Sequence, residues 1–158
     1  MRDKRFIAEH RGGPLKKEQH KQLMKWACLC AENVLPLFGG KSDEQLKNTL
    51  LVAKQWEKGK ATVGDARNAS LIAITVANES ANPIAAAVAR AVGHAVATAH
   101  MADHSLGAAL YALKAVKNAG KSTDAERKWQ NERLPKEIAE LVLTARSKKE
   151  RAFKDLRI

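Results

Sequence analysis

An alanine-rich stretch from Asn82 to His104 constrains the fold more than any other part of the sequence. Asn82 followed by Pro83 is the usual pattern of a helix N-cap and first helical position. Apolar residues then recur three or four positions apart, at Ile84, Val88, Val92, Val96 and Ala99. One narrow stripe carries Arg90, His94, Met101 and His104. Because nearly every other position is apolar, the stretch predicts the buried central helix of an all-α domain.

Helix-start and helix-stop residues divide the rest of the chain into further helices, predicted over 16–35, 43–58, 62–80, 123–133 and 135–145. Ser42 and Thr123 each begin a capping-box pattern. A helix running on from Pro83 past residue 118 would be unusually long. A break is therefore expected near 103–107, with Asp103 or Ser105 as the next N-cap.

The predicted fold is a single-domain helical bundle of about six to seven helices. We divide the chain into an N-terminal arm over 1–15, a helical domain over 16–145 and a basic C-terminal tail over 146–158. Phe6 and Ile7 are the residues expected to anchor the arm onto the domain. The chain length suits one domain with a real core.

The net charge of +11 is concentrated at the two ends of the chain. Residues 1–25 hold eight basic and three acidic residues, a sum of +5, and residues 146–158 hold six and two, a sum of +4. The remaining 26–145 sums to only +2. Basic ends of this kind attract nucleic acid, an anionic membrane or an acidic protein, or they only aid solubility.

Cys28 and Cys30, the only cysteines, would point about 200° apart on one helix, so they cannot bridge each other there. Two such thiols are typical of a reducing compartment. Met1–Ala8 is charged and no apolar signal core follows. The stretch from Ile84 to Met101 is too polar to span a membrane. These patterns predict a cytoplasmic protein.

Three residues at i, i+3 and i+4 could form a site: His100, Asp103 and His104. Two histidines four apart on a helix can bind one metal ion. The glutamate of a zincin HExxH motif is absent, and no second cluster clearly supplies a third ligand. The favoured interpretation is structural, with Asp103 capping a helix and the histidines hydrogen-bonding inside a tight junction. We therefore predict no metal and no cofactor.

Arg90 is one of few charges in the centre of the sequence, and a buried charge needs a partner. An Asp65–Arg90 or Asp103–Arg90 pair is expected, more often to specify the fold than to catalyse. If a pocket opens there, Arg90 and His94 would bind an anion or a carboxylate.

Motifs for nucleophilic catalysis and phosphate binding are missing, so the chain is not predicted to be an enzyme. There is no GxSxG elbow, and Gly39-Gly40-Lys41-Ser42 lacks the upstream glycine and strand of a P-loop. Trp26, Trp56 and Trp129 are interpreted as core residues or interface anchors.

Three stretches resemble a family of small helical bacterial immunity proteins associated with polymorphic toxin systems. They are WEKGKATVGDAR over 56–67, AVATAHMADHS over 95–105, and KWQNE over 128–132 with the following Leu134-Pro135. The resemblance implies a cytoplasmic protein that binds and neutralises a cognate toxin. The family provides no residue with an assigned role, so none is carried over.

The strongly positive charge is unusual for an inhibitor of a nuclease, which normally presents an acidic face to a basic nucleic-acid site. Under the immunity interpretation, the toxin is acidic and not a nuclease, or the near-neutral body provides the binding face. The remaining alternative is that the protein is not an immunity protein.

Three functions therefore remain open, and the first is favoured. One is a protein-binding module with charges at the interface rim and tryptophan anchors: Lys17, Lys21, Lys25, Trp56 and Trp129. The second is nucleic-acid binding through the basic ends. The third is a metal- or anion-dependent enzyme built on Arg90, His94, His100, Asp103 and His104. Homo-oligomerisation is compatible with the alanine-rich helices, and no membrane partner is predicted.

Overall fold

The computed structural model describes residues 2–39 and 43–152 and folds into an all-α bundle. Seven α-helices make up the bundle: α1 (Lys17–Val34), α2 (Asp43–Glu57), α3 (Val63–Glu79), α4 (Pro83–Ala97), α5 (His104–Asn118), α6 (Thr123–Glu132) and α7 (Lys136–Ala152). Three short 3-10 turns accompany them: η1 (Lys4–Phe6), η2 (Glu9–Arg11) and η3 (Leu35–Leu37). The predicted fold class is confirmed.

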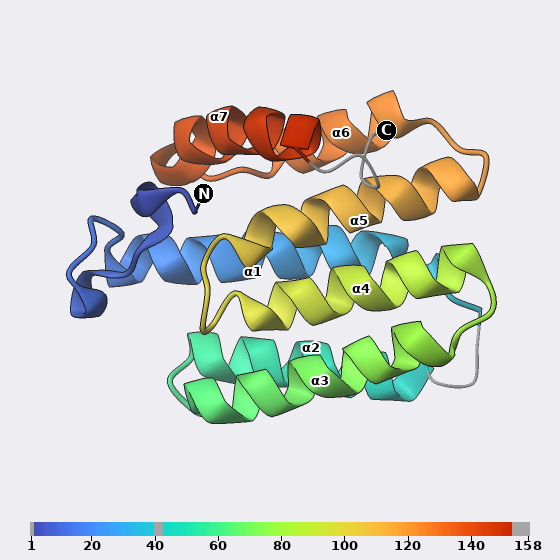
Figure 1. Cartoon of the computed structure of the whole chain (residues 1–158), viewed down its shortest axis with the longest axis horizontal. Helices are drawn as coiled ribbons and strands as arrows, with labels where there is room; N and C mark the ends of the chain where they lie inside the picture. Colours follow the sequence, from blue (N-terminus) through green and yellow to red (C-terminus); the bar gives the residue numbers. More distant parts are fainter. Residues whose placement is uncertain (1, 40–42, 153–158) are drawn as a thin grey trace.

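The helices form three levels in Figure 1, with α2 and α3 on one side, α6 and α7 on the other, and α1, α4 and α5 between them. Helix α4 packs against α1, α2, α3 and α5. From Ala85 to Ala97 every α4 residue is buried except Arg90 and His94, which are partly exposed. The prediction of a buried central helix is thus confirmed.

The N-terminus of α4 forms as predicted, but its C-terminus lies earlier than expected. The Asn82 side chain accepts a hydrogen bond from the Ile84 N–H at 2.9 Å. The break predicted near 103–107 instead covers 98–103. At the break, the buried His20 Nε2 of α1 donates to the Thr98 carbonyl oxygen at 2.6 Å. In a continuing helix that oxygen would accept from residue 102.

The prediction that Asp103 or Ser105 caps α5 through its side chain is also wrong. Asp103 occupies the N-cap position, but its side chain makes no capping hydrogen bond. The Ser105 hydroxyl donates backward to the Ala102 carbonyl oxygen at 2.7 Å and so does not cap the helix either. Without a side-chain cap, the first N–H groups of α5 bond to the preceding turn: His104 N–H donates to the Met101 carbonyl oxygen at 3.0 Å.

The other predicted caps have mixed outcomes. Thr62 and Asp65 form a reciprocal capping box at the start of α3. Helix α6 is capped by Ser122, whose hydroxyl accepts from the Ala125 N–H at 3.1 Å, and not by Thr123. The cap expected at Ser42 lies outside the described residues.

The N-terminal arm packs against α7. Phe6 is buried, as expected of an anchor, and shares a core cluster with Trp26 of α1 and Val142 of α7. The Arg5 guanidinium also donates to the Thr144 hydroxyl at 2.9 Å. The N-terminal arm is therefore attached to α7.

Helix α7 continues through the beginning of the proposed C-terminal tail. Arg146, the first residue of that tail, is buried and donates to the side-chain oxygens of Gln130 and Asn131. Gln130 in turn donates to the Ala109 carbonyl oxygen at 3.0 Å, and its own carbonyl accepts from the Trp26 indole at 2.9 Å. This buried network joins α1, α5, α6 and α7. Residues 153–158 of the tail lie outside the described part of the chain.

Candidate functional site: a charged groove along the first helix

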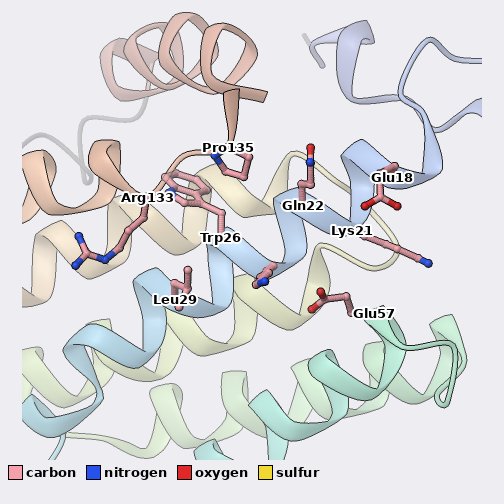
Figure 2. A pocket seen from close by; sticks show the side chains of 9 residues that line it. Glu18, Lys21, Gln22, Trp26, Leu29, Glu57, Arg133 and Pro135 are labelled. Carbon is pink, nitrogen blue, oxygen red and sulfur yellow. The ribbon is translucent and has the colours of Figure 1, made fainter. Parts of the chain in front are cut away.

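A groove of about 540 Å³ runs along the outer side of α1. Residues from α1, from the end of α2 and from the α6–α7 connection line it: Glu18, Lys21, Gln22, Lys25, Trp26, Leu29, Glu57, Arg133 and Pro135. Figure 2 shows Arg133, Trp26 and Leu29 toward one end, with Lys21, Glu18 and Glu57 toward the other. The volume lies within the range of about 300–1,000 Å³ that is usual for binding clefts.

The groove follows from the two faces of α1. One face of this helix is apolar and buried, including Leu23, Ala27 and Val34. The other face, which carries Lys21 and Lys25, is left to solvent next to the α6–α7 connection. Trp26 lies at the boundary, buried in the core cluster and also lining the groove.

The cations of the groove have no acidic partner among the described residues. No carboxylate oxygen there lies within 4.0 Å of the charged nitrogens of Lys21, Lys25 or Arg133. By contrast, Lys54 of α2 pairs with Glu32 of α1 at 2.7 Å. Lys25 has Leu29 one turn ahead and Lys21 one turn behind, so its own helix provides no acid at i+4 or i−4.

The predicted tryptophan anchors flank this groove without lining it. Trp56 is partly buried, and its ring lies 4.9 Å from the His20 ring between centroids. Trp129 is also partly buried, with the Arg133 guanidinium 3.9 Å above its ring centre. Arg133 therefore joins a tryptophan anchor to the groove through a cation–π contact. Lys17, predicted with Lys21 and Lys25, is exposed and lies outside the groove lining.

The other predicted cluster is a junction between α4 and α5. His94 Nδ1 lies 3.0 Å from His104 Nδ1, and the His100 and His104 rings are 5.4 Å apart between centroids. The predicted arrangement on one continuous helix is wrong, because the loop over 98–103 separates His94 from His104. Tyr111 stacks on the other side of His94 at 5.1 Å.

Burial keeps these histidines neutral. It lowers the pKa of His94 to about 3 and that of His104 to about 4, and it also lowers the pKa of His100. A neutral imidazole can donate from one nitrogen and accept at the other, so one Nδ1 donates to the other across the junction. Among the described residues, no group of three or more His, Cys, Asp or Glu side chains is placed to hold a metal ion.

The predicted ion pairs of Arg90 are wrong. Asp65 is exposed and bonded to Thr62, while Asp103 lies 3.9 Å from Arg2. Both carboxylates therefore contact other partners, and Arg90 and His94 form no anion pocket with them. The two cysteines are buried, and burial raises the pKa of Cys28 to about 12, which makes it a poor nucleophile.

A second surface feature is an exposed apolar strip on α3. Leu71, Ile72 and Ile74 are 56%, 48% and 43% exposed. Exposed apolar surface is one mark of an interaction site.

Comparison of the sequence with protein families gives a match that covers the groove. The family described as "Imm-5 like putative immunity protein" matches residues 13–137, which span α1 through the first turn of α7. The chain belongs to this family. The Imm-5 like match includes every residue that lines the groove and the three predicted histidines.

Comparison with curated proteins and with solved structures gives no significant match. In the described part of this Imm-5 like family member, no helix is both long enough and apolar enough to cross a membrane. Any role of the groove, the histidine junction and the α3 strip is therefore inferred from the geometry of this chain alone.

Proposed function

We propose that this protein is a cytoplasmic immunity protein that binds a cognate bacterial toxin and neutralises it without catalysis. Membership of the Imm-5 like family over residues 13–137 is the observation that supports this function most directly. The poorly nucleophilic cysteine and the neutral, hydrogen-bonded histidines of the junction agree with a binding protein.

The groove along α1 is the surface we assign to the toxin. It offers cations that have no acidic partner in the described chain, and its wall includes the rigid indole of Trp26. Interfaces gain most of their affinity from aromatic and arginine anchors near their centre. Arg133 stacked on Trp129 provides such an anchor at one end of the groove.

Co-expression tests this function. Each candidate toxin encoded beside the gene for this protein would be induced in a bacterial host, with and without the protein, and growth would be followed. We expect the protein to restore growth against one toxin and to form a stoichiometric complex with it on gel filtration. Unchanged killing by all of these toxins would contradict the proposal.

Nucleic-acid binding is the second candidate, favoured by the contact between the basic N-terminal arm and α7. The Arg5–Thr144 hydrogen bond brings the N-terminal arm against α7, which carries Lys148 and Arg151 on its exposed side. If this surface binds nucleic acid, affinity for a labelled duplex falls steeply between low and physiological salt. A salt-independent or undetectable interaction would remove this candidate.

A further inference from the structure

The two ends of the α1 groove differ in charge, and this difference indicates what fits between them. Arg133 lies toward one end, whereas at the other end the carboxylates of Glu18 and Glu57 outnumber the single ammonium of Lys21 (Figure 2). The apolar surfaces of Trp26 and Leu29 are found near the Arg133 end. A matching occupant therefore needs negative charge and an apolar group close together, at one end only.

A polyanion does not match this pattern. The backbone of nucleic acid carries negative charge at every nucleotide. Along this groove it would have to pass Glu18 and Glu57, which have no cationic partner within 4.0 Å among the described residues. Like charges placed together in this way disfavour binding.

The side of the groove next to α7 holds a weakly bonded amide. The Gln22 Nε2 donates to the Glu137 Oε2 in a long hydrogen bond of 3.4 Å. The Gln22 Oε1 is buried and accepts from no donor among the described residues. An unsatisfied buried acceptor is unfavourable. Turning this amide toward the groove would let its oxygen accept from a backbone N–H, which a peptide provides and a small anion does not.

We propose that the groove binds a short acidic peptide segment of its protein partner. An aspartate or glutamate of the segment contacts Lys25 and Arg133, and a neighbouring apolar side chain packs on Leu29 beside the buried Trp26. Gln22 bonds to the backbone of the segment. The segment runs with its acidic part toward Arg133 and with neutral or basic residues toward Glu18 and Glu57. Only the identity of the protein that carries the segment rests on the proposed function.

A random peptide display library selected on the full chain tests the binding class without knowledge of the toxin. We expect enriched peptides to combine acidic residues with at least one large apolar residue. A labelled enriched peptide would then be titrated by fluorescence polarisation, next to a copy with each acid changed to its amide. The amide copy should bind about tenfold more weakly or worse.

Matched variants separate the groove from the overall charge. Lys25→Glu with Arg133→Glu reverses two groove cations, and Lys121→Glu with Lys128→Glu reverses two exposed cations outside the lining. Both double variants change the net charge equally, and all four positions are exposed, so folding should survive and is checked by circular dichroism. The groove variant should lose about tenfold or more of the peptide affinity and the control less than about twofold.

Several outcomes would overturn the proposal. Selection of neutral or basic peptides, no enrichment, or equal losses in both double variants would each contradict a groove specific for an acidic segment. A labelled single-stranded oligonucleotide that bound more tightly than the peptide, and lost affinity in the groove variant, would assign the groove to nucleic acid.

The growth assay distinguishes this proposal from the proposed function. If the wild-type protein neutralises a toxin and the groove variant does so equally well, the acidic-segment proposal fails and the immunity function stands. If the wild-type protein neutralises none of the toxins, the immunity function fails, and the peptide titrations still decide what the groove binds.

Discussion

The junction between α4 and α5 and the groove along α1 are both rich in titratable side chains, but their environments are opposite. At the junction, burial keeps His94 and His104 neutral, and each has a partner in the other's ring nitrogen. In the groove, Lys25 and Arg133 are exposed and have no acidic partner in the described chain. The comparison indicates that the junction holds helices together, whereas the groove has binding capacity available for another molecule.

The largest difference in stability is expected between the same leucine-to-alanine substitution in the interior and on the surface. Leu113 is 0% exposed on α5, while Leu71 is 56% exposed on α3. Leu113→Ala should lower the free energy of unfolding by about 2–5 kcal/mol because it leaves a cavity. Leu71→Ala should change it by less than about 0.5 kcal/mol. Urea denaturation measures both, and similar losses would contradict the burial pattern.

Acid should destabilise the junction next. The pKa of His94 falls from 6.5 to about 3 on folding, so between these pH values His94 is protonated in the unfolded chain and neutral in the folded chain. Above pH 6.5 His94 is neutral in both states and does not lower the free energy of unfolding. Between pH 6.5 and 3 the free energy of unfolding falls, because only the unfolded chain protonates this histidine. His94 alone should then account for roughly 3 kcal/mol between pH 7 and pH 4. His104, which is less deeply buried, adds to this, and His20 and His100 titrate in the same direction.

A His94→Gln variant provides the control for this acid effect. Glutamine does not titrate, so the variant should lose stability more gradually than wild type between pH 6.5 and 4, whatever its stability at neutral pH. Thermal unfolding across this pH range measures the slopes. An unchanged slope would show that His94 is not the buried group that takes up the proton.

Close packing at the junction should make a glycine-to-alanine substitution costly there and harmless on the exposed start of α3. A Cβ at Gly107 would overlap the His94 ring, whereas a Cβ at Gly64 meets only the Thr62 hydroxyl at 3.6 Å. Gly107→Ala should cost about 1–3 kcal/mol of stability through overpacking. Gly64→Ala should be neutral or stabilise α3 by up to about 1 kcal/mol. If Gly107→Ala is as harmless as Gly64→Ala, then α4 and α5 are not held this closely.

The smallest stability effect is expected in the groove. Lys25→Glu should change the free energy of unfolding by less than about 0.5 kcal/mol because Lys25 has no acidic partner in the described chain. Arg133→Glu should cost about 0.5–1 kcal/mol because it removes the stacking of Arg133 on Trp129. The double variant should fail to restore growth in the co-expression assay. Loss of folding together with loss of protection would show that these cations are structural.

Local patterns predicted most of the fold. The alanine periodicity from Asn82 onward placed α4 in the core. What the sequence could not reveal are contacts between distant residues. His20 donates to the Thr98 carbonyl oxygen just after α4, and Gln130 joins Trp26 to Arg146. Neither contact has a signature in local spacing.

The candidate site was only partly predictable for the same reason. Lys21 and Lys25 were predicted as charges at the rim of a protein interface, but the groove also needs Glu57 from α2 and Arg133 from the α6–α7 connection. The histidines were predicted by spacing on a single helix, and tertiary packing instead brought them together across a loop. Arg146 read as the start of a basic tail because a buried arginine cannot be told from an exposed one without its partners.

Hydrogen–deuterium exchange on the complex with a neutralised toxin tests the contrast between groove and junction most directly. We predict added protection over 18–29 of α1 and at 133–135, with no change at His94, His104 or Tyr111. Protection centred on the α3 strip or on the junction, with none along α1, would contradict the assignment of the groove as the binding surface.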